Sequence, residues 1–223
     1  IIMTPFGHPL NQKMQEPKPG FLEGVRKLAD KYGSVLIFDE VRTCFRLRMG
    51  GAQELYGVKP DLTVLGKGMA NGWAISVVTG KKDVMMAASS KLFISSTFFP
   101  NSEGYIAALK TIEVMEREKV IDNIWDKGNR LMGKIRGIID KYPNAGAELT
   151  GVAPMFMITF TKGDPKTTKD RRTEFYTQLI RRGFFFTPHH HAYICFRHTE
   201  DDLNLTAEAI DESMAYISEK FKE

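Results

Sequence analysis

Two short stretches of the chain contain the residues whose types and spacing could do chemistry. Lys67 stands between Gly66 and Gly68 directly after an apolar run, and Asp39 and Glu40 end another apolar run. A lysine on a turn after a buried strand should be partly desolvated, which favours the neutral, nucleophilic amine. An ordinary exposed turn lysine would have the same local sequence, so the assignment depends on the elements that position Lys67.

The elements around these residues predict a parallel sheet. Residues 35–38 are a continuous apolar run, typical of a strand buried on both faces, and residues 62–65 are expected to form the next buried strand. A helical pattern over 21–29 precedes the first run. A helix followed by an all-apolar strand is half of a β-α-β unit. Ligands of open parallel sheets bind beyond the carboxyl ends of the strands, so Asp39 and Lys67 should share one crevice.

A carboxylate and a lysine at neighbouring strand ends are the pair that pyridoxal phosphate (PLP) requires. The lysine forms a Schiff base with the cofactor aldehyde, and the carboxylate keeps the pyridine nitrogen protonated, which makes the ring an electron sink. The pair of Asp39 and Lys67 therefore predicts a PLP site. The alternative is a buried ion pair with a purely structural role.

The remainder of the chain predicts two α/β domains. A strand is expected at 75–79, and strand or loop at 93–99. A short helical piece is expected after Gly50-Gly51, ending at Tyr56, and helices are expected at 82–88, 101–118 and 120–142. The tail predicts a strand, a helix, two strands and a helix, at 151–161, 168–182, 184–187, 192–196 and 203–220, with Thr199 as the N-cap of the last helix. The change from strand-rich to helix-rich sequence places a domain boundary between 1–118 and 119–223.

Composition excludes several classes of function. The chain has 31 Lys and Arg against 27 Asp and Glu, and its net charge of +4 is dispersed, so we expect no nucleic-acid partner. No apolar run is long enough to span a bilayer, and no signal peptide is visible, so we expect no membrane partner. Two cysteines make no disulfide framework and indicate a reducing, cytoplasmic location.

Three stretches resemble a known family. Residues 36–43 (Leu-Ile-Phe-Asp-Glu-Val-Arg-Thr), 50–53 (Gly-Gly-Ala-Gln) and 60–68 (Pro-Asp-Leu-Thr-Val-Leu-Gly-Lys-Gly) closely resemble class III aminotransferases, which are fold-type-I PLP enzymes. Within this class the chain looks most like the glutamate-1-semialdehyde 2,1-aminomutase branch. The resemblance runs from Ile1 through the tail at 198–203, and the acid, the lysine and their separation match together.

The resemblance implies roles for four residues. Lys67 would form the Schiff base and move a proton between the substrate and the cofactor, and Asp39 would contact the pyridine nitrogen. Val41 would pack against one face of the ring. Thr97 would bind the cofactor phosphate across a homodimer interface, although a plain loop hydroxyl is the alternative. The implied reaction moves an amino group from a small-molecule donor to a carbonyl acceptor through pyridoxamine phosphate.

The chain also departs from the family. Cys44 stands where the family usually has glycine, and Phe98–Ser102 contains aromatic residues and a proline where the family is small and glycine-rich. Ile1–Met3 predicts a buried strand that begins in mid-element, so we expect the later part of the large domain plus the small C-terminal domain. The upstream half, from the same gene or another chain, would supply the phosphate-binding loop and the aromatic residue that stacks on the ring.

Several alternatives stay open on the sequence alone. The chain could be an aminotransferase or an aminomutase, could catalyse decarboxylation or racemisation, or could be a non-catalytic, partial-site relative that serves as an assembly subunit. The run His189–His191 is weakly compatible with a metal site, but side chains in succession rarely converge on one ion, so packing is expected instead. Arg42, Arg46 and Arg48 could face a substrate anion or form salt bridges.

Overall fold

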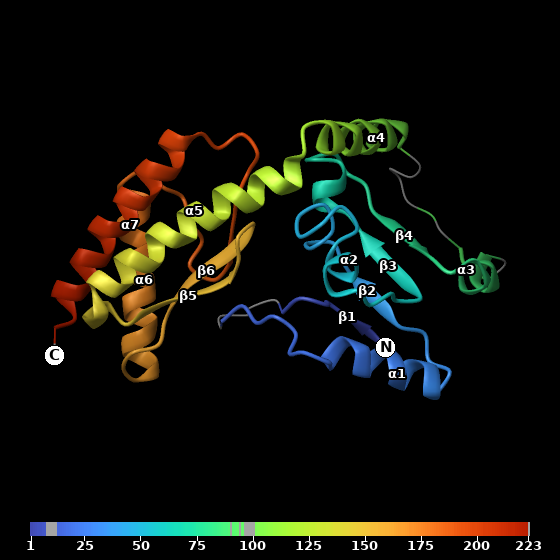
Figure 1. The fold of residues 1–223 in the computed structure, drawn as a ribbon, viewed down its shortest axis with the longest axis horizontal. Helices are drawn as coiled ribbons and strands as arrows, with labels where there is room; N and C mark the ends of the chain where they lie inside the picture. The colour runs from blue at the N-terminus through green and yellow to red at the C-terminus, as the bar shows by residue number, and fades with distance from the viewer. Residues whose placement is uncertain (8–12, 90, 94, 96–100, 223) are drawn as a thin grey trace. The chain divides into compact units, whose positions relative to one another are not determined.

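The computed structural model describes residues 1–7, 13–89, 91–93, 95 and 101–222 (Figure 1). The described residues divide into two compact units, one of residues 1–7 and 16–121 and the other of residues 13–15 and 122–222. Each unit combines helices with a β-sheet, so the predicted α/β class is confirmed. The predicted domain boundary at residues 118 and 119 stays a prediction.

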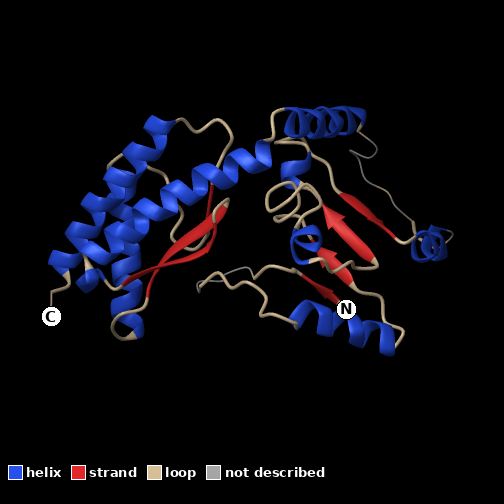
Figure 2. Ribbon diagram, in the orientation of Figure 1, coloured by secondary structure: helices blue, strands red, loops and turns tan. Residues whose placement is uncertain are grey.

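The first unit contains a four-stranded mixed sheet (Figure 2). Its strands, in spatial order, are β1 (Ile2–Met3), β2 (Ile37–Asp39), β3 (Leu62–Leu65) and β4 (Val77–Gly80). β1, β2 and β3 are parallel, whereas β4 is antiparallel to β3. The strand expected at 75–79 therefore exists, but it begins two residues later.

The strand expected at the start of the chain is not buried. β1 is an edge strand that pairs with β2 only, and the side chains of Ile1 and Ile2 are 53% and 67% exposed. Among the described residues, no further strand or helix covers the exposed side chains of Ile1 and Ile2. By contrast, Leu36, directly before β2, and Phe38 of β2 are fully buried, because they pack with Leu22 and Ala29 of helix α1.

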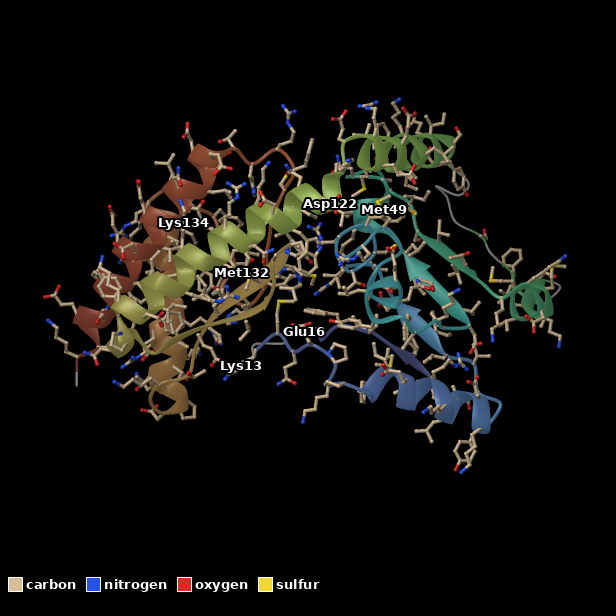
Figure 3. All side chains as sticks on the ribbon, viewed as in Figure 1. Lys13, Glu16, Met49, Asp122, Met132 and Lys134 are labelled. Carbon is tan, nitrogen blue, oxygen red and sulfur yellow. The ribbon has the colours of Figure 1, made fainter. Side chains whose placement is uncertain are left out.

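Helices of the first unit cover the sheet and connect its strands. They are α1 (Phe21–Lys31), α2 (Ala52–Tyr56), α3 (Lys82–Ser89) and α4 (Ser102–Arg117), with a one-turn 3-10 helix η1 (Lys67–Met69) after β3. Asn101 begins α4 as its N-cap, because its side chain accepts a hydrogen bond from the Glu103 amide at 3.0 Å. Tyr56 at the end of α2 donates to Glu16 (labelled in Figure 3) at 3.1 Å.

The second unit contains an antiparallel sheet in the order β5 (Ala147–Val152), β6 (Met155–Phe160), β7 (Ala192–Tyr193). Its helices are α5 (Val120–Lys141, of which the residues from Asp122 onward belong here), α6 (Pro165–Arg181) and α7 (Glu200–Lys220), with the 3-10 turn η2 (Pro143–Ala145). Every residue of β6 is buried, and α6 packs against both β6 and α7. Figure 3 labels Met132 and Lys134 of α5; Met132 is buried, whereas the Lys134 ammonium donates to Asn204 of α7.

Two strand predictions for the tail are wrong. The strand expected at 151–161 is a hairpin of β5 and β6, and residues 147–150 of β5 were not expected because they are mixed in polarity. Residues 184–187 form no strand, since Gly183 (φ 87°) ends the preceding turn and Phe185 is 82% exposed without a partner strand. The Thr199 cap is confirmed: its side chain accepts from the Asp202 amide at 3.1 Å, in a capping box that begins α7.

Candidate active site at the ends of β2 and β3

The carboxyl ends of two paired parallel strands position the predicted acid and lysine. In the register of β2 with β3, Asp39 lies opposite Val64, and the next amide, of Glu40, donates to the Val64 carbonyl at 3.0 Å. Lys67 follows β3 by two residues, as the first residue of η1. The two residues therefore lie beyond the same edge of the sheet, where open parallel sheets bind ligands.

Lys67 occupies an unusual backbone conformation. Its φ of 43° lies in the left-handed region, which costs a residue with a side chain about 1 kcal/mol. Met69, two residues later, is buried against Ala108 of α4 and anchors the turn. Such strain persists only where the surroundings enforce it, which is typical of functional sites.

The predicted desolvation of Lys67 is wrong for the described residues. The Lys67 side chain is exposed, because η1 lies past the end of β3 and the described chain leaves the side chain open to solvent. Asp39 is half-buried rather than buried. A close ion pair between these two residues is not among the salt bridges of the described residues, so the structure gives no support to the alternative of a buried structural pair.

Val41 lies between the acid and the lysine turn. Its amide donates to Asp39 Oδ1 at 3.1 Å, which fixes the carboxylate relative to the backbone. Its branched side chain lies against Gly66, since a Cβ at Gly66 would be 3.7 Å from Val41 Cγ1. The structure thus brings Asp39, Val41 and Lys67 to one edge of the sheet, whereas Thr97 lies outside the described residues.

Glu40 is a residue of this edge of the sheet whose role was not predicted from sequence. Its side chain is fully buried, and its carboxylate accepts hydrogen bonds from the Thr43 hydroxyl and from the amides of Ala52 and Gln53, the latter two at 2.8 Å. Burial raises the pKa of Glu40 and outweighs these hydrogen bonds, which lower it. The available signal was the pair Gly50-Gly51: a Cβ at Gly51 would lie 2.4 Å from Glu40 Oε2.

Cys44 fits the turn without the glycine that the family usually has there. The left-handed residue of this turn is Phe45, with φ 58°, so Cys44 needs no glycine conformation. Its amide donates to the Glu40 carbonyl at 3.0 Å and its thiol to the Met49 carbonyl at 3.2 Å. Burial, reinforced by the nearby Glu40 carboxylate, raises the pKa of Cys44 to about 12, so it stays a neutral thiol.

The last two histidines of the run pack against each other and against Tyr193. His190 and His191 stack with ring centroids 4.2 Å apart, and His191 Nε2 lies 2.5 Å from the Tyr193 hydroxyl. Among the described residues, no group of three or more His, Cys, Asp or Glu side chains is arranged to hold a metal ion.

Among the residues that the structure describes, no helix is both long enough and apolar enough to cross a membrane. Arg42 keeps one guanidinium nitrogen buried without a hydrogen-bond partner.

The three residues at this edge of the sheet fit the ring of pyridoxal phosphate. Lys67 offers an accessible amine for the aldehyde, and Asp39 offers a half-buried carboxylate for the pyridine nitrogen. Val41 offers a branched apolar surface beside Gly66. The individual roles of these residues stay predictions.

Comparisons with known proteins agree with this chemistry. The family model for class III aminotransferases matches residues 13–221. The 3-aminobutyryl-CoA aminotransferase of Cloacimonas acidaminovorans (strain Evry) is 49% identical over 97% of this chain and 52% of that protein. A glutamate-1-semialdehyde 2,1-aminomutase of Archaeoglobus fulgidus is 35% identical over 92% of this chain and 51% of that protein.

Solved structures give the same result. The Sphingopyxis sp. MTA144 FumI protein, in its PLP internal aldimine form, has a TM-score of 0.88 and 26% identity over 99% of this chain and 52% of its own. A transaminase with PLP bound has a TM-score of 0.87 at 21% identity over 100% of this chain and 53% of its own, which shows the shared fold. The chain spans about half the length of the curated relatives that it matches. The family and these structures imply PLP as the cofactor, and the chain belongs to the class III aminotransferase family.

Proposed function

We propose that the protein containing this chain is a PLP-dependent aminotransferase in which Lys67 is the catalytic residue. One observation carries the proposal: two hydrogen-bonded parallel strands end in Asp39 and, through η1, in Lys67 at the same edge of the sheet. Membership of the class III family supports it. A non-catalytic relative would not need to keep Lys67 in a left-handed conformation that costs free energy.

Each residue of the site has a separate task in this proposal. PLP supplies an electron sink that stabilises negative charge on the substrate carbon. Lys67 Nζ would hold the cofactor aldehyde and would move the proton at the substrate carbon. The Asp39 carboxylate would hold a proton at the pyridine nitrogen, and the Val41 amide keeps that carboxylate in place.

For the substrates we propose a small-molecule amino donor and a carbonyl acceptor. The 49% identical relative is a 3-aminobutyryl-CoA aminotransferase, so 3-aminobutyryl-CoA is the first donor to assay, with 2-oxoglutarate or pyruvate as acceptor. The second candidate is an aminomutase, which moves the amino group within one substrate, because a 35% identical relative has that activity in its name.

We further propose a cytoplasmic homodimer in which Thr97 binds the cofactor phosphate of the partner copy. The free thiols of Cys44 and Cys195 are consistent with a reducing compartment. Because the chain spans about half of its relatives' length, the remaining phosphate contacts are proposed to come from residues outside it, in the same gene product or another chain. Light scattering of the purified gene product measures the number of copies.

The proposed function is tested by replacing Lys67 in the full product of the gene. We expect Lys67→Ala to abolish amino transfer and the visible absorption band of bound PLP, because no other amine takes its place at the end of β3. Borohydride reduction of the unmodified protein followed by peptide mapping should find the cofactor on the peptide that contains Lys67. Lys59→Ala, which removes an exposed lysine from the same unit, is the control and should keep both activity and band.

Two results would contradict the assignment. One is a Lys67→Ala protein that retains turnover and the visible band. The other is a reduced cofactor that maps to a different lysine. If the unmodified protein binds no PLP at all, the proposed function itself is wrong.

A further inference from the structure

The turn after β2 is fastened to the start of α2 by a buried carboxylate. We propose that Glu40 is a positioning residue for the cofactor: it fixes Asp39 and Val41 in place by clamping the turn that follows β2 onto Ala52 and Gln53. This inference rests on the proposed function, because it concerns the same cofactor site. The inference goes beyond the proposed function because it gives a role to Glu40, which was not assigned any contact with the cofactor.

The carboxylate of Glu40 accepts three hydrogen bonds, from the turn after β2 and from the start of α2. Oε2 accepts from the Thr43 hydroxyl and from the Ala52 amide, and Oε1 accepts from the Gln53 amide. The Glu40 side chain is completely buried, so water does not compete for these hydrogen bonds. Gly51 allows this close approach, because any larger residue would place a Cβ within 3 Å of three Glu40 carboxylate atoms.

The backbone of Glu40 connects this clamp to the predicted cofactor ligands. Its carbonyl accepts from the amides of Thr43 at 3.1 Å and Cys44 at 3.0 Å, which closes a tight turn directly after Asp39. Its amide donates to the Val64 carbonyl of β3 at 3.0 Å. Val41 therefore has little freedom, and its amide holds Asp39 Oδ1 at 3.1 Å. Movement of Glu40 would move both Asp39 and Val41.

Gln53 extends the clamp to the strand that leads to the lysine. Its backbone amide binds Glu40, while its side-chain amide donates to the buried Thr63 hydroxyl at 3.2 Å. Thr63 belongs to β3, four residues before Lys67. Gln53, at the start of α2, is therefore hydrogen-bonded both to the residue after β2 and to a residue of β3. These two hydrogen bonds restrict the distance between Asp39 and Lys67.

A carboxylate is needed at position 40 rather than a neutral amide of the same shape. Glu40→Gln has one acceptor oxygen, and its NH2 group would face a hydroxyl or amide donor that now has an acceptor. A donor facing a donor in a buried site leaves at least one group unsatisfied, so the turn must shift. Groups that orient metal ligands in other proteins are typically worth about 10–100-fold in affinity, and we expect a similar scale here.

The experiment compares variants of the full gene product by two readouts that do not depend on turnover. These are the dissociation constant for PLP and the wavelength and pH midpoint of the bound cofactor's visible band. We expect Glu40→Gln to weaken PLP binding by about tenfold or more and to shift the band, at temperatures well below its melting point. Glu54→Gln is the matched control, because Glu54 is an exposed carboxylate of the same segment that accepts from the Gly50 amide at 2.6 Å.

Thr43→Val keeps the test decisive if Glu40→Gln fails to fold. It removes one hydroxyl donor without changing the side-chain shape, and we expect a smaller weakening and a shift of the band in the same direction. If the variant that folds is less stable but binds PLP with unchanged affinity and an unchanged band, Glu40 has only a structural role and the proposal is wrong. If the unmodified protein and Glu54→Gln also bind no PLP, the proposed function has failed rather than the role of Glu40.

Discussion

Asp61 has three donors around its buried carboxylate. Oδ2 accepts from the Leu36 amide at 2.7 Å and from Arg26 Nη1 at 2.8 Å, and Oδ1 lies 2.6 Å from Lys81 Nζ. The side chain is only 7% exposed. Asp61 thereby connects Arg26 of α1, Leu36 directly before β2 and Lys81 directly after β4. Asp61 itself directly precedes β3. At the scale of single residues, this buried carboxylate is a polar contribution to the stability of the first unit.

The pKa of Asp61 gives its contribution a defined pH dependence. Burial alone would raise this pKa, but the Leu36 amide, Lys81 and Arg26 outweigh burial and hold it well below the usual range. The folded pKa is thus lower than the unfolded value of about 4. The stabilisation is therefore fully present above that value and is lost as the pH falls through it toward the folded pKa.

We predict that Asp61→Asn lowers the free energy of unfolding by about 2 kcal/mol at neutral pH, because its amide group cannot accept from all three donors. The difference from the unmodified protein should shrink as the pH falls below about 4. Urea unfolding at neutral and acidic pH measures both effects.

The control for this prediction is Asp30→Asn. Asp30 pairs with the same Arg26 at 2.7 Å, but its side chain is 63% exposed, so the loss should be less than about 1 kcal/mol. Equal losses for the two variants, or a loss for Asp61→Asn that is the same at every pH, would contradict the account of Asp61.

At the scale of elements, helix α5 contains three glycines in two different environments. Gly128 is buried against the turn between β5 and β6, and a Cβ there would lie 2.0 Å from the Ala153 carbonyl oxygen. Gly133 and Gly137 are exposed, and a Cβ at either would have no atom within 4 Å outside the helix itself. The same substitution should therefore have opposite effects within one helix.

We predict that Gly128→Ala destabilises the protein by about 2 kcal/mol, because α5 or the hairpin must move to accommodate the methyl group. Gly133→Ala and Gly137→Ala should instead raise stability by up to about 1 kcal/mol, since alanine favours the helix more than glycine does. Thermal unfolding of the three variants measures the contrast. Stabilisation by Gly128→Ala would show that α5 does not approach the Ala153 backbone closely.

Elements were predictable from sequence where periodicity alone determines them. Helices α4 and α5 and strand β3 appear where the apolar pattern places them. Residues 147–150 of β5 were missed because they are mixed in polarity, and they form a strand only by pairing with the fully buried β6. Conversely, the aromatic run at 184–187 has strand-like residues but no strand to pair with.

At the scale of the whole molecule, the sequence predicts the position of the candidate acid and lysine better than it predicts the hydrogen bonds that hold them in place. The placement of Asp39 and Lys67 at one edge of the sheet was predictable because their types and positions at the ends of two strands are local features, and their roles stay predictions. The role of Glu40 was not predictable, because its partners Ala52 and Gln53 reach it only after the chain has folded back. The exposure of Lys67 was also unexpected, since it depends on what covers the end of β3.

The final prediction concerns the kinetics of the complete protein. In the proposed function Asp39 and Lys67 serve one cofactor site, whose cofactor carries the amino group between the two substrates, so we expect the product of the amino donor to leave before the carbonyl acceptor binds. An aminotransferase of this kind should give parallel lines in double-reciprocal plots of rate against donor concentration at several fixed acceptor concentrations. Intersecting lines would require both substrates to be bound at once, which one site does not allow. Conversion of a single substrate without any acceptor would instead favour the aminomutase activity of the relative from Archaeoglobus fulgidus.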